Sequence, residues 1–189
     1  MKIISTLIKD LFIIEPNIFC DSRGYFFEPF NKKKFNQKFP HIKFCQDNES
    51  KSNFGVLRGL HYQLPPKAQT KLVRVIKGKV LDVAVDIRSG SPTFGNHFSI
   101  ELSEENKKQL LIPRGFAHGF IVLSDYAILS YKVDNFYDTD YDKGIIFNDK
   151  NLQIDWKIKK TDIKLSSKDE KLPSFHKAPL FDYLKEQYD

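Results

Sequence analysis

A histidine and a lysine lie ten residues apart in two segments of strand-like composition. His61 ends the run Arg58-Gly59-Leu60-His61, and Lys71 begins the run Lys71-Leu72-Val73-Arg74-Val75. Imidazole has the ordinary side-chain pKa nearest to neutrality, so His61 is a candidate proton acceptor. A lysine ammonium held nearby can stabilise a developing oxyanion. Together the two side chains predict removal of a proton from a carbon beside a carbonyl group.

The elements that must position these side chains are short apolar segments separated by turn residues. The segments span residues 11–14, 25–27, 72–76, 80–87, 96–102, 109–113, 116–123 and 127–133. Many short strands with turn signals between them predict an all-β sandwich or barrel. Two short helices are also expected, over residues 32–39, where Phe35 and Phe39 are four apart, and over residues 179–188 at the end of the chain.

The clearest strand signal runs from Lys71 to Ile87, with Gly78 as the expected turn of a hairpin. The second arm alternates, which places Leu81, Val83, Val85 and Ile87 on a core face. Asp82 and Asp86 fall on the opposite face, which suits the polar lining of a barrel mouth.

The composition of the chain limits the classes of protein to which it can belong. With 189 residues, 41% hydrophobic, and seventeen Phe, the chain is expected to form one domain, residues 1–189, with a substantial core. The net charge of +6 favours an anionic partner, but the lysines are scattered, so we expect a solvated surface and a phosphorylated small molecule rather than nucleic acid. No apolar run approaches the ~20 residues that span a membrane.

The two cysteines, Cys20 and Cys45, form no CxxC pair, which argues against a zinc site. They are expected to be free, partly buried thiols. The first residues show no signal peptide, and a cytoplasmic location is expected.

Ordered motifs along the chain resemble those of the dTDP-4-dehydrorhamnose 3,5-epimerase family of cupin-like jelly rolls. The motifs are Asp21-x-Arg23-Gly24-x-Phe26-x-Glu28, Gln46-Asp47-Asn48-x-Ser50, 55–61, 71–75, 82–88, 91–95, 112–120, Tyr131-Lys132, Asn148-Asp149 and Leu165-Ser166-x-Lys168-Asp169. The resemblance covers residues 12–169. It implies a homodimer that acts on a dTDP-sugar with a ketone at C4, without a cofactor or a metal.

The resemblance assigns four catalytic roles. His61 is the general base at C3 and C5, and Asp169 orients it. Lys71 stabilises the enolate charge on the C4 oxygen, and Tyr131 returns a proton at C5. Taken without the resemblance, Lys71 is equally well interpreted as an edge-strand lysine pointing to solvent. The alternative for Tyr131 is a barrel-wall aromatic, and for Asp169 a solvated loop carboxylate is then the favoured interpretation.

The resemblance also suggests substrate-binding residues. Arg58 and Arg23 are candidate diphosphate ligands, because a guanidinium matches phosphate oxygens, although surface ion pairs are the alternative. Phe26 and Phe19 are candidates to contact the thymine. The remaining candidates are Glu28, Gln46, Asn48, Tyr137 and His118, the last with an equally plausible structural role. Some of these residues are expected to act across a dimer.

Three alternatives stay open at this point. The enzyme could invert only C3 or only C5 of another nucleotide-linked 4-keto sugar. It could catalyse a 3,4-ketoisomerisation on the same fold. It could also be a non-catalytic jelly roll that binds sugar nucleotides. A metal-dependent cupin is disfavoured, because His61 and His118 are the only plausible histidine ligands.

Overall fold

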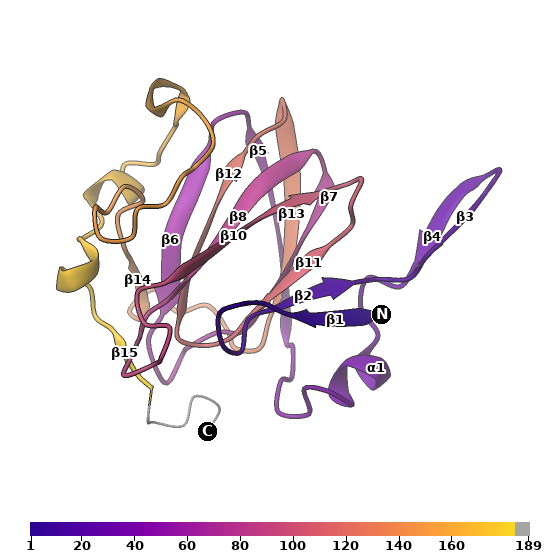
Figure 1. The fold of residues 1–189 in the computed structure, drawn as a ribbon, viewed down its shortest axis with the longest axis horizontal. Helices are drawn as coiled ribbons and strands as arrows, with labels where there is room; N and C mark the ends of the chain where they lie inside the picture. The colour runs from indigo at the N-terminus through magenta and orange to yellow at the C-terminus, as the bar shows by residue number, and fades with distance from the viewer. Residues whose placement is uncertain (184–189) are drawn as a thin grey trace.

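Two antiparallel sheets pack face to face in the computed structural model, which describes residues 1–183 (Figure 1). The first sheet has the order β1 (Lys2–Ser5), β2 (Phe12–Glu15), β11 (Gln109–Ile112), β7 (Lys71–Lys77), β13 (Tyr126–Val133) and β5 (Gln46–Asn53). The second has the order β10 (His97–Ser103), β8 (Lys79–Asp86), β12 (Phe116–Val122), β6 (Leu57–Gln63) and β14 (Asp142–Gly144). The all-β prediction is therefore confirmed.

The smaller elements lie around these sheets. Strands β3 (Ile18–Asp21) and β4 (Gly24–Phe27) form a hairpin that projects away from the barrel (Figure 1). The C-terminal segment runs along the side of the barrel next to β6 and contains the 3₁₀ helices η1 (Lys160–Asp162), η2 (Asp169–Lys171) and η3 (Phe175–Lys177). The last short pair is β9 (Arg88–Ser89) with β15 (Phe181–Asp182). No helix within residues 1–183 is long and apolar enough to cross a membrane.

The predicted hairpin at Gly78 is wrong, because β7 and β8 belong to different sheets. The chain passes from one sheet to the other at this glycine, which has a φ of +76°. A Cβ atom here would lie 2.1 Å from the carbonyl oxygen of Tyr126, so only glycine fits the corner. A short apolar–turn–apolar pattern does not distinguish a hairpin from such a corner.

Strand β8 is buried on both faces, rather than on one face as predicted. Leu81, Val83, Val85 and Ile87 do pack in a core, but this core lies between the second sheet and the C-terminal segment, where Trp156 and Phe175 cover it. The opposite face, with Val80 and Ala84, packs inside the barrel against the first sheet. Each buried aliphatic side chain contributes about 1.5–3 kcal/mol, so the C-terminal segment is a structural part of the barrel.

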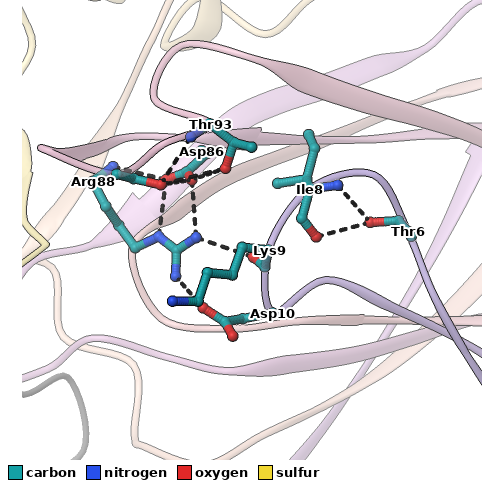
Figure 2. Close-up of polar contacts among 8 residues, drawn as sticks. Thr6, Ile8, Lys9, Asp10, Asp86, Arg88 and Thr93 are labelled. Carbon is teal, nitrogen blue, oxygen red and sulfur yellow. Dashed lines mark hydrogen bonds and ion pairs between the residues drawn. The ribbon is translucent and has the colours of Figure 1, made fainter.

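Asp82 and Asp86 of β8 are both fully buried, and Asp86 is the last residue of the strand. Asp86 holds the Arg88 guanidinium through bonds of 2.9 Å, and Arg88 also reaches Asp10 at 2.8 Å (Figure 2). Thr93 donates a further hydrogen bond of 2.7 Å to Asp86. Burial raises the pKa of Asp86, but these donors outweigh it and hold the pKa below its ordinary value. The network anchors the loop between β1 and β2 to the end of β8.

The N-terminal helix α1 (Lys32–Asn36) is shorter than predicted, although its aromatic pair is placed as expected. The Asn31 side chain caps the helix by accepting a 3.1 Å hydrogen bond from the Lys34 amide. Phe35 and Phe39 are buried with ring centroids 5.0 Å apart, and they pack on β2 and β11 with Phe12.

Two further predictions are wrong. The described part of the expected C-terminal helix contains β15 instead, because Phe181 is buried and its amide donates a 3.2 Å hydrogen bond to the Ile87 carbonyl. Residues 184–188 of that prediction lie outside the described residues. Cys20 and Cys45 are free as expected but exposed, not partly buried, because one lies on the projecting hairpin and the other just before edge strand β5.

Candidate active site

A cavity of about 530 Å³ opens between the two sheets, beside the C-terminal segment. Both sheets and the segment contribute polar side chains to it. They are Arg58 and His61 of β6, His118 of β12, Lys71 of β7, Tyr131 of β13, Ser50 of β5, and Lys164, Ser166, Lys168 and Asp169 of the segment. The fold thus brings together all four predicted catalytic residues, and Arg58 and His118 with them.

His61 and Asp169 form a close pair, although 108 positions separate them in the chain. The His61 Nε2 atom lies 2.6 Å from Oδ1 of Asp169, whose side chain is only 4% exposed. Burial raises the pKa of Asp169, but hydrogen bonds from His61 and Ser166 outweigh it, so the pKa lies below its ordinary value. The carboxylate therefore stays ionised and accepts one ring N–H, which leaves the other ring nitrogen as a proton acceptor.

Two glycines fix the strand that carries His61. His61 lies opposite His118 in the β6–β12 ladder, and the register shifts in the next positions. Gly59 has a φ of +136°, and a Cβ atom there would lie 2.5 Å from the Cα atom of Gly119. The bulge brings the two strands into close contact two residues before His61.

Lys71 and Tyr131 face the histidines from the other sheet. Burial lowers the pKa of Lys71 to about 8, and the nearby carboxylates Asp142 and Asp82 oppose this effect. Burial also raises the pKa of Tyr131, so its hydroxyl stays protonated at neutral pH. The cavity therefore holds a base on one wall, and a cation and a proton donor on the other.

His118 forms a second histidine–carboxylate pair deeper in the barrel. Its Nε2 atom lies 3.0 Å from both oxygens of the fully buried Asp82. Asp82 also acts electrostatically on Lys71 and raises the pKa of that lysine against the effect of burial. Among residues 1–183, no group of three or more His, Cys, Asp or Glu side chains is arranged to hold a metal ion.

The exposed rim of the cavity is cationic. Arg58 is held by a 3.0 Å hydrogen bond from its Nε to the Ser52 hydroxyl, and Lys164 and Lys168 line the cavity beside it. Lys168 belongs to one of the family motifs but has no predicted role, and no sequence pattern points to Lys164. Both lie in the irregular C-terminal segment, where strand or helix periodicity offers no signal of side-chain direction.

The other predicted binding residues do not line this cavity. Phe19, Arg23 and Phe26 lie on the β3–β4 hairpin, where Arg23 is paired with Asp21 at 2.6 Å. Glu28, just after the hairpin, binds Lys34 at 2.6 Å.

Three predicted binding residues lie closer to the cavity. Gln46 and Asn48 share the face of β5 that carries the cavity residue Ser50, and the Gln46 side chain donates a 2.8 Å hydrogen bond to Asn48. Tyr137 lies in the loop after β13, with its hydroxyl 2.9 Å from Asp142. Within one chain, the structure separates the hairpin residues from the cavity and brings these three near it.

An imidazole paired with a buried carboxylate, a lysine and a phenol line one cavity of this β-barrel, which suits an enzyme that moves protons beside a carbonyl group. The family profile of dTDP-4-dehydrorhamnose 3,5-epimerase matches residues 5–177. The chain belongs to this family, whose fold is the cupin-like jelly roll, and it is an isomerase.

Individual relatives agree with this membership. The dTDP-4-dehydrorhamnose 3,5-epimerase of Shigella flexneri is 55% identical over 84% of this chain and 88% of its own length. That of Pseudomonas aeruginosa is 48% identical over 96% of this chain and 99% of its own. The crystal structure of the Legionella pneumophila dTDP-6-deoxy-D-glucose-3,5-epimerase with dTDP-4-keto-L-rhamnose has a TM-score of 0.93 and 45% identity, covering 97% of this chain and 99% of that one.

Proposed function

We propose that this protein converts dTDP-4-dehydro-6-deoxy-D-glucose to dTDP-4-dehydro-L-rhamnose by inverting C3 and C5. The observation that carries the proposal is the His61–Asp169 pair, 2.6 Å apart, in one cavity with Lys71 and Tyr131. The family membership and the relatives of the same name support the choice of substrate.

The protons at C3 and C5 are acidic because both carbons neighbour the C4 ketone. In the proposed mechanism His61 takes the proton, and the electron pair of the C–H bond becomes the enolate, with negative charge on the C4 oxygen. The Lys71 ammonium stabilises this charge, an effect worth a few kcal/mol when the donor is preorganised, about 3–4 in the best-measured oxyanion holes. Asp169 keeps His61 in one tautomer and stabilises the imidazolium that forms.

Inversion requires that a new proton arrive on the opposite face. Tyr131 lies on the sheet across from His61, which suits it to donate its phenolic proton at C5. Its raised pKa favours the protonated form, and the enolate is basic enough to accept from it. The C–H bond forms as the O–H bond breaks, and solvent then reprotonates the phenolate.

The cationic rim is proposed to receive the diphosphate. Arg58, Lys164 and Lys168 supply three positive charges at the cavity entrance, and a guanidinium matches phosphate oxygens in geometry. Gln46, Asn48 and Tyr137 are proposed to contact the sugar or the base, and His118 to support the pocket. No cofactor is required, because no step changes an oxidation state. His61 takes each proton and passes it to solvent, Tyr131 returns a proton at C5, and solvent in the cavity is proposed to return the proton at C3.

A homodimer is proposed to complete the nucleotide site. The projecting hairpin exposes Phe19 by 62% and Phe26 by 67%, which is costly for an isolated chain but suits contact with a second subunit and its bound thymine. Arg23, with its side chain 88% exposed, and Glu28 would reach the neighbouring cavity with them. The whole chain is proposed to act as one domain in the cytoplasm, where the exposed thiols of Cys20 and Cys45 stay reduced.

The dimer has a direct test. Co-expressed chains carrying His61→Ala and Phe26→Ala would pair to give one intact site in each heterodimer, and about one quarter of wild-type activity after random pairing. The co-expressed chains could instead sediment at twice the chain mass and still show no recovered activity. That result would contradict a site shared between two subunits.

The substrate and the double inversion are tested by product analysis. The purified protein is incubated with dTDP-4-dehydro-6-deoxy-D-glucose, the ketone is reduced with borohydride, and the sugar is compared with L- and D-configured standards. L-configured products are expected. D-sugars inverted only at C3 would indicate a single-site epimerase, and a ketone moved to C3 would indicate a ketoisomerase. Binding of dTDP without any conversion would indicate a binding protein.

A further inference from the structure

Asp142, the first residue of β14, joins two segments at the cavity rim. Its carboxylate accepts a 2.9 Å hydrogen bond from the Tyr137 hydroxyl and an ion-paired hydrogen bond from Lys168. The Asp142 side chain is 10% exposed, whereas that of Lys168 is 54% exposed. A nearly buried carboxylate therefore holds the ends of two more exposed side chains.

The two segments matter because each carries a part of the proposed site. Lys168 lines the cavity and directly precedes Asp169, the partner of His61. Tyr137 belongs to the loop that follows β13, the strand of Tyr131. Asp142 thus connects the segment that orients the base to the loop after the strand of the proposed acid.

The same carboxylate acts electrostatically on Lys71, the half-buried lysine of the site. Burial is the larger influence and lowers the pKa of Lys71, and Asp142 opposes it more strongly than Asp82 does. Asp142 also contributes to the raised pKa of Tyr131, after burial itself. A negative charge in this place favours both the ammonium and the protonated phenol, which are the forms that the proposed mechanism uses.

We propose that Asp142 is a positioning residue for the epimerisation: its carboxylate draws Lys168 and Tyr137 together at the cavity rim and places a negative charge on the Lys71 side of the cavity. This inference rests on the proposed function for its effect on activity. The other titratable or charged groups around Lys71 come from both sheets and the C-terminal segment, and they are Arg58, His61, Asp82, His118, Tyr131, Lys164, Lys168 and Asp169.

The direct test measures the protonation of Lys71 and does not depend on enzyme turnover. Protein labelled with ¹³C at lysine Cε is titrated by NMR, and the Lys71 signal is assigned by its loss in Lys71→Gln. In Asp142→Asn the midpoint is expected to fall below the wild-type value of about 8, because one nearby negative charge is removed. Each full pH unit of that fall would lower the charged fraction at pH 8 from about one half to about one tenth, which predicts a roughly fivefold loss of kcat.

Matched variants distinguish the effect of the Asp142 charge from the effect of its hydrogen bonds. Asp140→Asn removes an exposed carboxylate two positions away and is expected to leave the midpoint unchanged. Asp142→Glu keeps the charge and is expected to restore the midpoint. Tyr137→Phe removes one hydrogen bond to Asp142 and is expected to raise KM without moving the Lys71 midpoint.

A Lys71 midpoint that stays in place in Asp142→Asn, as in Asp140→Asn, would overturn the inference. A midpoint that falls together with the alkaline limb of kcat supports it. Should the wild-type protein convert no substrate, the proposed function fails, and the NMR midpoint alone still decides whether Asp142 keeps Lys71 charged.

Discussion

The pH dependence of the wild-type enzyme follows from the environment of Lys71. Burial lowers the pKa of this lysine from an ordinary 10.5 to about 8, and its proposed role requires the ammonium. The charged fraction is about 90% at pH 7 and about 10% at pH 9, whereas an ordinary lysine would still be about 97% charged at pH 9. We therefore expect kcat/KM to fall about tenfold between pH 7 and pH 9, with an alkaline midpoint near 8.

Tyr131 does not account for this loss of activity between pH 7 and pH 9, which is the alkaline limb of the pH profile. Burial raises the pKa of Tyr131, so its phenol remains protonated between pH 7 and pH 9. The assay is the initial rate of substrate conversion from pH 6 to pH 10, with circular dichroism at each pH to verify that the protein is folded. In Lys71→Arg, the guanidinium stays charged, so the plateau is lower but the limb near pH 8 disappears. A wild-type profile that stays flat to pH 10, or a limb that persists in Lys71→Arg, would refute this assignment.

Three further predictions follow from the same contacts. Tyr131→Phe is expected to reduce inversion at C5 by about 10²-fold while proton exchange at C3 persists, measured by NMR of the product; equal losses at both carbons would contradict its role. Gly59→Ala is expected to destabilise the fold by at least ~2 kcal/mol in urea denaturation, because its Cβ would lie 2.5 Å from Gly119, whereas the control Gly24→Ala has a similar φ of +128° but no neighbour within 4 Å and should cost less. Lys71→Met removes the free-energy cost of keeping a charged ammonium away from water. The melting temperature at pH 7 is therefore expected to rise, by about 2–4 °C for each kcal/mol of that cost. That gain should shrink as pH rises through 8, where the folded protein sheds the charge, and no gain at pH 7 would contradict the account.

Strand content was predictable from the sequence because it depends on local pattern. The segments now seen as β10, β11, β12 and β13 match the predicted ranges to within one or two residues at each end. The sheet to which each strand belongs was not predictable in this way. Gly78 looks like a hairpin turn in sequence, and only the tertiary contact with Tyr126 makes it a corner between the sheets.

The end of the chain illustrates the same limit. A helix was predicted from Pro179 onward, but Phe181 gains more by burial against Tyr62 and by pairing with β9 than a helical turn would provide. Alternation along β8 correctly grouped its aliphatic side chains. It did not reveal that the C-terminal segment covers that face, because such coverage depends on residues more than sixty positions away.

The partners within the candidate site could be predicted from the family resemblance but not from local sequence patterns. No spacing rule connects His61 to Asp169 across 108 positions, yet the two lie 2.6 Å apart. Asp142 carried no sequence signal, because its importance comes from contacts with Tyr137 and Lys168 that the folded chain alone creates.

The enolate mechanism with His61 as its base is tested by proton NMR of the substrate in heavy water with the purified protein, EDTA, and a parallel His61→Ala sample. This mechanism predicts that deuterium enters both C3 and C5 with the wild-type protein and enters neither with His61→Ala. Exchange that persists in His61→Ala, or that never occurs in a folded wild-type protein that binds dTDP, would contradict it.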